Sequence, residues 1–252
     1  MQIMHFSFDD IAYTLHDLCI SSYASAFDQP FLRDLRSIHT ETGAVFTLFC
    51  FNRFGKLPAY DIANLPDRYQ AELAAESRWL RFGFHAEDDA SKYAHTPGAA
   101  ESFLRCNAAL ERFAGGESID SFLRLGFFSG SEKSVRALQQ LGLRGLYAAD
   151  DARLSYCLNQ QENDTVIREG AYRDAQGMLY VRSLPRLDRN TEHDIIALLE
   201  DQSAYRALTE VFMHEYVYLS DPDTFRSRIA AIARWANEQG YAHRFHSGEV
   251  TA

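Results

Sequence analysis

The stretch MHFSFDD, Met4–Asp10, joins a short apolar run to two adjacent carboxylates, Asp9 and Asp10. Its length and its aromatic content predict a buried β-strand that ends at the two acids. Like charges side by side cost free energy unless each carboxylate has its own partner. A turn or a helix cap accounts for most such pairs. The alternative is that the two acids do different work, one binding a metal ion and the other handling a proton.

Similar apolar runs recur along the chain and alternate with amphipathic segments. The expected strands are residues 3–8, 45–51, 80–85, 122–128, 145–149, 178–184, 209–217 and 241–245. The expected helices are residues 31–43, 65–80, 96–113, 131–142, 191–208 and 221–240. Gly43 is expected to end the first of these helices, and Ser131 or Ser129 is expected to cap the fourth.

This alternation of strands and helices predicts an α/β fold with a parallel sheet. About seven repeats without a break in composition favour a distorted (β/α) barrel of about seven parallel strands. No linker, internal repeat or low-complexity tract interrupts the sequence, so residues 1–252 are expected to form one domain. The connection at residues 51–67 is longer than usual and is expected to cover part of a cleft.

The composition excludes several classes of partner. Of the 252 residues, 46% are hydrophobic and 24% are charged, which is typical of a globular protein with a sizeable core. The net charge of -10 argues against nucleic acid, because phosphate backbones need clustered Lys and Arg. No apolar window is long enough to span a membrane, and the N-terminus does not resemble a signal peptide. Four scattered cysteines indicate free thiols in a reducing compartment, and so a cytoplasmic protein.

Polar residues fall at or near the ends of several expected strands. Asp9 and Asp10 end the first, His85 ends the third, Arg124 lies in the fourth, and His214 lies late in another apolar run. In a parallel α/β barrel the carboxyl ends of all strands meet on one face. Residues far apart in the sequence are therefore expected to meet there, with side chains suited to a metal-dependent hydrolase.

The order of these residues resembles the polysaccharide deacetylases, the NodB-homology carbohydrate esterases of family 4. Ser7-Phe8-Asp9-Asp10 is similar to their first motif, T-F-D-D. HAEDD, 85–89, keeps the first His of H-[ST]-x-x-H and has Asp89 in place of the second. RLGFF, 124–128, keeps the Arg of R-x-P-[FY] without its proline, and FMH, 212–214, is similar to the closing L-L-H. The chain looks most like divergent deacetylases of bacterial surface-polysaccharide synthesis, including O-antigen synthesis.

The resemblance implies removal of an acetyl group from an N-acetylated sugar or glycan. This reaction needs water that is nucleophilic at neutral pH, and a divalent metal ion with an open coordination position supplies it. Asp10, His85 and Asp89 are the expected ligands, with His95 as the alternative to Asp89. Two carboxylates and one imidazole suit zinc, and they suit manganese, iron or cobalt better than a two-histidine site does.

The remaining residues receive the other roles of the reaction. Asp9 is expected to be the general base, His214 the general acid for the leaving amine, and Arg124 the cation that holds Asp9 ionised. A backbone N–H near Phe127 would stabilise the oxyanion. The aromatic residues Phe51, Phe54, Tyr93 and Tyr147 are candidates for stacking on sugar rings.

Each residue taken alone also has a structural explanation, such as a turn, a core histidine or a surface ion pair. Two other functions also fit the pattern. One is a carbohydrate-binding barrel that has lost catalysis, which the altered second and third motifs favour. The other is hydrolysis of a non-sugar amide. The glycines of GFFSGS, 126–131, lack the G-K-[ST] of a phosphate-binding loop, so a nucleotide site is discounted.

Overall fold

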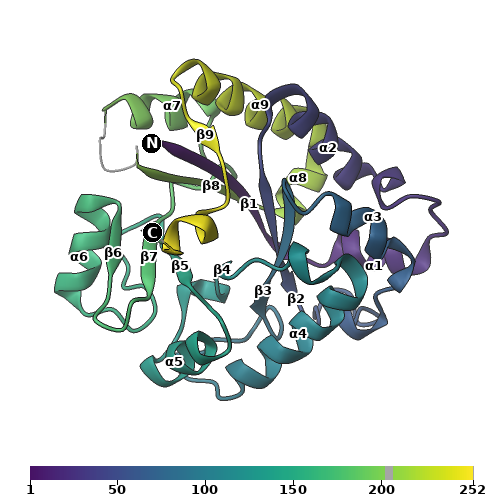
Figure 1. Ribbon diagram of the computed structural model, residues 1–252, viewed down its shortest axis with the longest axis horizontal. Coiled ribbons are helices and arrows are strands. Elements are labelled where there is room, and N and C mark those ends of the chain that lie inside the picture. Colours follow the sequence, from purple (N-terminus) through teal and green to yellow (C-terminus); the bar gives the residue numbers. More distant parts are fainter. Residues whose placement is uncertain (202–206, 252) are drawn as a thin grey trace.

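Two mainly parallel sheets form the centre of the protein (Figure 1). The computed structural model describes residues 1–201 and 207–251. One sheet has the order β3-β2-β1-β8, with β9 also paired to β1, and the other has the order β4-β5-β7-β6. The strands are β1 Ile3–Ile11, β2 Phe46–Phe51, β3 Leu80–Ala86, β4 Phe122–Leu123, β5 Gly145–Ala148, β6 Ala171–Arg173, β7 Leu179–Arg182, β8 Leu208–His214 and β9 Ala242–His243.

Backbone hydrogen bonds join the two sheets along both sides. On the β3 side, the N–H of Asp120 donates to the carbonyl of Phe82 at 2.8 Å. On the β8 side, the N–H of Leu184 donates to the carbonyl of Glu210 at 3.0 Å, and Leu187 donates to Phe212 at 2.9 Å. The sheets therefore close into a distorted barrel, as the alternation in the sequence predicts.

Helices surround the barrel on the outside (Figure 1). They are α1 Tyr13–Ile20, α2 Pro30–Thr42, α3 Gln70–Ala75, α4 Ala99–Ala114, α5 Glu132–Gln140, α6 Gln160–Glu169, α7 Glu192–Asp201, α8 Glu215–Ser220 and α9 Pro222–Glu238. Gly43 ends α2 in the left-handed region at φ 78°, as expected, because a residue without Cβ adopts that conformation freely. Of the two candidate caps of α5, Ser131 is the one that accepts the N–H of Ser134.

The helix expected over residues 65–80 is wrong for most of its length. A short 3₁₀ turn, Asp67–Tyr69, leads into α3, which ends at Ala75. The reason is the strand that follows, because Leu80 already pairs with Phe46 as the first residue of β3. The apolar spacing that suggested a long helix comes instead from core contacts of the turn, the short helix and the strand.

Several elements lie outside the sequence-based expectations. Helices α1, α6 and α8 have no counterpart there, and neither does β6, which runs antiparallel to β7 at the edge of its sheet. Strand β4 is only two residues long, and a 3₁₀ turn over Gly126–Phe128 replaces the rest of the expected strand. The helix expected over 191–208 is present as α7, and its continuation over 202–206 lies outside the described residues.

The amino end of the barrel is filled by aromatic side chains. The ring of Tyr147 lies 4.7 Å from that of Phe122 and 5.6 Å from that of His246. His246 belongs to the short C-terminal turn that crosses this face (Figure 1). Strand β5 passes so close to Phe122 that a Cβ on Gly145 would lie 1.9 Å from the ring. Packing here depends on a glycine, and the opposite end of the barrel is left for the polar residues.

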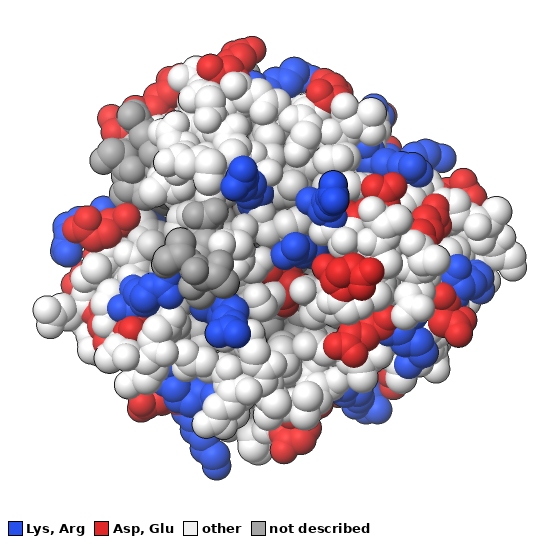
Figure 2. All heavy atoms as spheres, in the orientation of Figure 1, with Lys and Arg blue, Asp and Glu red and all other residues white. Residues whose placement is uncertain are grey.

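The surface and the cysteines agree with the composition. Acidic and basic side chains are interspersed over the face shown in Figure 2. All four cysteines are free. No helix in the part of the chain that the structure describes combines the length and the apolar character that crossing a membrane requires.

A buried carboxylate connects the start of α1 to the end of β8. Glu215, directly after β8, is fully buried and accepts the N–H groups of Ala12, Tyr13 and Thr14 at 2.9, 2.9 and 2.7 Å. These are N–H groups at the start of α1, which has no side-chain cap of its own. Glu215 therefore caps a helix distant in sequence and fixes the end of β8 beside the end of β1.

We expect Glu215→Ala to lower the free energy of unfolding by about 2–4 kcal/mol, because three buried N–H groups lose a charged acceptor. Glu238→Ala is the matched control, since Glu238 is exposed near the end of α9 and should change stability by less than about 0.5 kcal/mol. Urea unfolding with an unchanged slope measures both. Equal stability of the two variants would contradict the capping role.

Candidate active site

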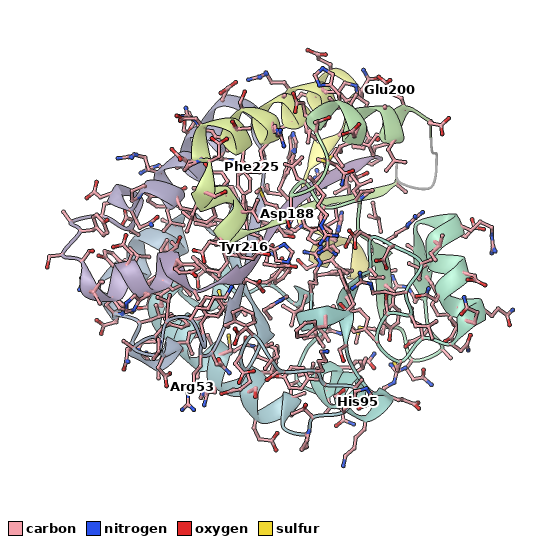
Figure 3. All side chains as sticks on the ribbon, turned by 180° about the vertical axis from the view of Figure 1, so that it is seen from behind. Arg53, His95, Asp188, Glu200, Tyr216 and Phe225 are labelled. Carbon is pink, nitrogen blue, oxygen red and sulfur yellow. The ribbon has the colours of Figure 1, made fainter. Side chains whose placement is uncertain are left out.

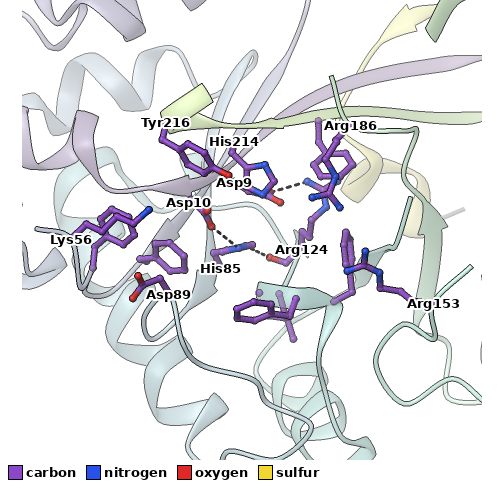
Figure 4. A pocket seen from close by; sticks show the side chains of 17 residues that line it. Asp9, Asp10, Lys56, His85, Asp89, Arg124, Arg153, Arg186, His214 and Tyr216 are labelled. Carbon is purple, nitrogen blue, oxygen red and sulfur yellow. Dashed lines mark hydrogen bonds and ion pairs between the residues drawn. The ribbon is translucent and has the colours of Figure 1, made fainter. Parts of the chain in front are cut away.

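A pocket of about 340 Å³ opens at the carboxyl ends of the strands (Figure 4). Its lining comes from β1, β2, β3 and β8 and from the segments that follow several strands. All seven residues that the sequence analysis assigned to the site line it: Asp9, Asp10, His85, Asp89, Arg124, Phe127 and His214. The strand-end argument therefore identifies where these residues meet, whereas their individual roles stay predictions.

The backbone of Asp10 explains how two neighbours reach one pocket. Adjacent residues of a regular strand point to opposite faces. Asp10 has φ 61°, in the left-handed region that a residue other than glycine rarely adopts. The register of β1 against β2 shifts between Phe8 and Ile11 at the same place. This local turn brings the side chains of Asp9 and Asp10 to the same pocket, and such a conformation is typical of functional sites.

Arg124 lies at the centre of a buried polar network below the pocket. Its guanidinium donates to Asp9 Oδ1 at 2.8 Å, to Ser7 Oγ at 2.9 Å and to Ser183 Oγ at 3.0 Å. It also donates to Glu210. Only 1% of Arg124 is exposed.

The arginine stays charged at this depth. Burial by itself lowers the pKa of Arg124, but the charges of Asp9 and Glu210 outweigh it and raise that pKa. A permanent cation therefore fixes one oxygen of Asp9, while the other has no hydrogen-bond partner among the described residues.

The imidazole of His85 pairs with Asp10. Burial by itself lowers the pKa of His85, but the charge of Asp9 and the hydrogen bond and charge of Asp10 outweigh burial and raise it. For Asp10, burial raises the pKa, but the hydrogen bond and charge of His85 outweigh burial and lower it. The raised pKa of His85 and the lowered pKa of Asp10 both mean that the charged forms of the two side chains stabilise each other.

The geometry of this pair fits a divalent cation. His85 Nδ1 lies 2.6 Å from the carbonyl oxygen of Arg124 and must donate to it, because a carbonyl only accepts. His85 Nε2 lies 3.3 Å from Asp10 Oδ1, and two acceptors at this distance need a proton or a cation between them. Histidines that bind metals commonly give one N–H to a carbonyl and use the other nitrogen as the ligand.

The expected third ligand does not join the pair. Asp89 lines the pocket, but its Oδ1 accepts the N–H of Gly55 at 3.3 Å. Within residues 1–201 and 207–251, no three His, Cys, Asp or Glu side chains lie close enough together to hold a metal ion. His95, the alternative ligand, is exposed at the periphery and does not line the pocket (Figure 3).

The turn after β4 lines the pocket and contains a backbone N–H without an acceptor among the described residues. Phe127 and Phe128 both have left-handed backbone conformations, with φ 59° and 54°. The turn is closed by hydrogen bonds from the N–H groups of Phe128 and Ser129, whereas the N–H of Phe127 has no acceptor among the described residues. The side chain of Phe127 is half exposed, and Lys92 Nζ lies 4.6 Å from its ring centre.

His214 has a carboxylate partner that the sequence analysis missed. Its Nδ1 lies 2.5 Å from Asp188 Oδ2, and its backbone N–H donates to Asp188 Oδ1 at 3.0 Å (Figure 3 labels Asp188). Burial lowers the pKa of His214, but the hydrogen bond to Asp188 and the charges of Asp9 and Asp188 outweigh it and raise that pKa. Asp188 follows the expected strand 178–184, so extending the strand-end argument to that strand would have indicated it.

The walls of the pocket carry further residues that were not predicted. Those with charged or hydroxyl groups are Lys56, Arg153, Arg186 and Tyr216. Of the four aromatic candidates for sugar stacking, Phe51 and Phe54 line the pocket. Tyr93 and Tyr147 are buried in the core and do not, which corrects their expected role.

Solved structures with the same fold are polysaccharide deacetylases and carbohydrate esterases. A putative polysaccharide deacetylase from Mycobacterium smegmatis aligns with a TM-score of 0.54 and 14% identity, over 96% of this chain and 92% of that chain. A peptidoglycan N-acetylglucosamine deacetylase aligns with a TM-score of 0.53 and 12% identity, over 96% and 84%. A family 4 acetyl xylan esterase from Clostridium thermocellum, solved with cobalt, aligns with a TM-score of 0.51 and 12% identity, over 95% and 86%.

These similarities show the fold, and they confirm the α/β class and the NodB-type barrel that the sequence motifs suggested. No family model matches the sequence. No curated protein matches it either.

We expect Arg124→Met to lower the free energy of unfolding by about 3–5 kcal/mol, because it leaves Asp9 and Glu210 buried without their cation. The double variant Arg124→Met/Glu210→Gln removes one of these charges and should recover at least about 1 kcal/mol. Urea unfolding of both single variants and the double variant gives the coupling energy. Simple additivity of the two changes would contradict the network described above.

Proposed function

We propose that this protein is a metal-dependent hydrolase that removes the acetyl group of an N-acetylated sugar. One observation carries the proposal. Asp9 and His214 are directly opposite each other on the neighbouring strands β1 and β8, and each is held by its own charged partner, Arg124 or Asp188. Two titratable groups fixed side by side in one pocket are what general base and general acid catalysis require.

Asp9 is the proposed general base. One of its oxygens is fixed by Arg124, and the other is available to take a proton from the attacking water. Arg124 positions this base, because its two terminal nitrogens are occupied by hydrogen bonds to Asp9, Ser7, Ser183 and Glu210.

His214 is the proposed general acid. Its Nδ1 is committed to Asp188, and its Nε2 has no partner in the described part of the chain. The hydrogen bond to Asp188 and the charges of Asp9 and Asp188 outweigh burial and raise the pKa of His214, which shifts the ring toward its protonated form. The ring can then donate its Nε2 proton to the departing amine, while Asp188 keeps the imidazole in one orientation.

Asp10 and His85 are the proposed ligands of a divalent cation, which supplies Lewis acidity that makes water nucleophilic at neutral pH. Asp89, on the same pocket wall, would complete the set by exchanging its hydrogen bond with Gly55 for the cation. The chemistry of two carboxylates and one imidazole suits zinc, manganese, iron or cobalt. The N–H of Phe127 is the proposed donor to the oxyanion.

A carbohydrate-binding barrel without catalysis is the second candidate. The separation of Asp89 from the Asp10–His85 pair favours it, because a metal site with only two protein ligands is weak. A non-sugar amide as substrate would use the same residues. A role in surface-polysaccharide synthesis such as O-antigen synthesis, and a cytoplasmic location, are further parts of the proposal that rest on the sequence motifs and the cysteines.

The function is tested with a panel of acetylated amino sugars, with and without a chelator. The wild-type protein should release acetate from at least one sugar and lose this activity reversibly with the metal. Asp9→Asn should abolish hydrolysis and keep the metal, whereas Asp10→Asn should lose both. Both variants remove one charge at neighbouring positions, so each controls for the other. Equal metal loss in both would contradict the separate roles, and metal-free wild-type protein with sugar affinity would favour the binding barrel.

The pH dependence of turnover tests the pair of His214 and Asp188. A general acid works while protonated, so activity should fall as the pH rises through the pKa of His214. Asp188 raises that pKa, and Asp188→Asn should therefore move this fall to lower pH and reduce turnover by about 10²–10⁴-fold. Rate profiles between pH 5 and pH 10 measure it. An unchanged alkaline limb would show that Asp188 only holds the loop.

A further inference from the structure

Two arginines form one wall of the pocket, on the side away from Asp10 and Asp89. Arg153 and Arg186 both line it, and Figure 4 shows them across the pocket from Lys56 and Asp89. We call these two residues the arginine wall. They belong to a chain whose net charge is -10, so their position is not an effect of a generally basic surface.

Each arginine is held from behind by its own aspartate. Asp150 and Asp151 follow β5 in tandem, and neither lines the pocket. Arg186 donates through Nε and one terminal nitrogen to Asp150, both at 3.0 Å. Arg153 donates in the same way to Asp151, at 2.7 and 2.5 Å. Two parallel hydrogen bonds fix the plane of each guanidinium.

Each residue of the arginine wall keeps a terminal nitrogen without a hydrogen-bond partner among the residues that the structure describes. In both residues one terminal nitrogen, Nη1, makes no hydrogen bond to any described residue. Because the arginines line the pocket and their aspartates do not, the positive members of the two ion pairs are the ones that face the pocket. A rigid guanidinium edge with free N–H groups suits planar or tetrahedral oxyanions.

The proposed metal position limits where an anionic substituent can lie. Asp10 and His85 line the pocket on that side, and the acetamido group of the substrate would occupy it. A substrate whose acetamido group reaches His85 and Asp10 would therefore direct any anionic substituent toward the arginine wall.

We propose that the arginine wall binds an anionic group, a phosphate or a carboxylate, carried by the acetylated substrate. This proposal rests on the proposed function for the position of the acetamido group. It narrows the substrate class from acetylated sugars in general to acidic or phosphorylated ones.

Calorimetric binding to the full chain tests the proposal with three probes. N-acetylglucosamine is neutral, N-acetylglucosamine 1-phosphate carries a phosphate, and N-acetylmuramic acid carries a carboxylate. At least one anionic probe should bind about tenfold or more tightly than the neutral one, and added salt should weaken this preference. The phosphate and carboxylate arms distinguish the two sources of the anion.

Arg153→Gln and Arg186→Gln should each remove most of the preference. Arg168→Gln is the matched control, because it removes an exposed arginine–carboxylate pair, with Glu169, outside the pocket. Arg186 and Asp150 are largely buried, so Arg186→Gln requires a check of folding by circular dichroism. Arg153 is about half exposed, so Arg153→Gln should fold normally and can be interpreted even if Arg186→Gln does not fold.

Three results would overturn the proposal. The neutral and anionic probes could bind equally, neither anionic probe could bind at millimolar concentration, or the preference for the anionic probe could survive in both variants. The outcome is separate from that of the proposed function, because binding is measured without turnover. Arginine-dependent binding without deacetylation would retain the anion site and reject the enzyme. Deacetylation of neutral sugars without any preference for anionic ones would retain the enzyme and reject the anion site.

Discussion

The buried guanidinium of Arg124 is the interaction on which the rest of the site depends. It contacts Asp9 on β1, Glu210 on β8 and Ser183 just after β7, and so connects both sheets across the barrel interior. A charge at this depth is tolerable only with opposite charges beside it, and both terminal nitrogens of Arg124 have such partners. Pairing Arg124 with Asp9 and Glu210 at once holds β1 and β8 in the register that places Asp9 opposite His214.

The sequence predicts the parts of the fold and the site that depend on regular periodicity. Strands that are buried on both faces read as apolar runs, and their ends coincide with Asp9, Asp10, His85 and His214. The helix over 65–80 could not be predicted correctly, because its apolar spacing serves a turn and the start of β3.

Three residues of the candidate site that the sequence analysis did not predict lie in loops. Asp188 and Arg186 lie in the connection between β7 and α7, and Arg153 lies in the connection after β5. Loop residues have no periodicity, and their partners are set by tertiary contacts. The left-handed conformation of Asp10 is equally hidden, because aspartate adopts it only where its surroundings require it.

The pairing of β1 has a consequence for the order in which the protein folds. Ser7 and Glu210, which share a hydrogen bond, are 203 residues apart. At about 5–20 residues per second, a ribosome needs on the order of ten to forty seconds between them. During this interval β1 has β2 as a neighbour, while its other edge stays open and Arg124 lacks one of its two carboxylates. The catalytic end of the barrel therefore cannot form before β8 is synthesised, and until then the nascent chain carries an apolar strand edge that is open to chaperones or to aggregation.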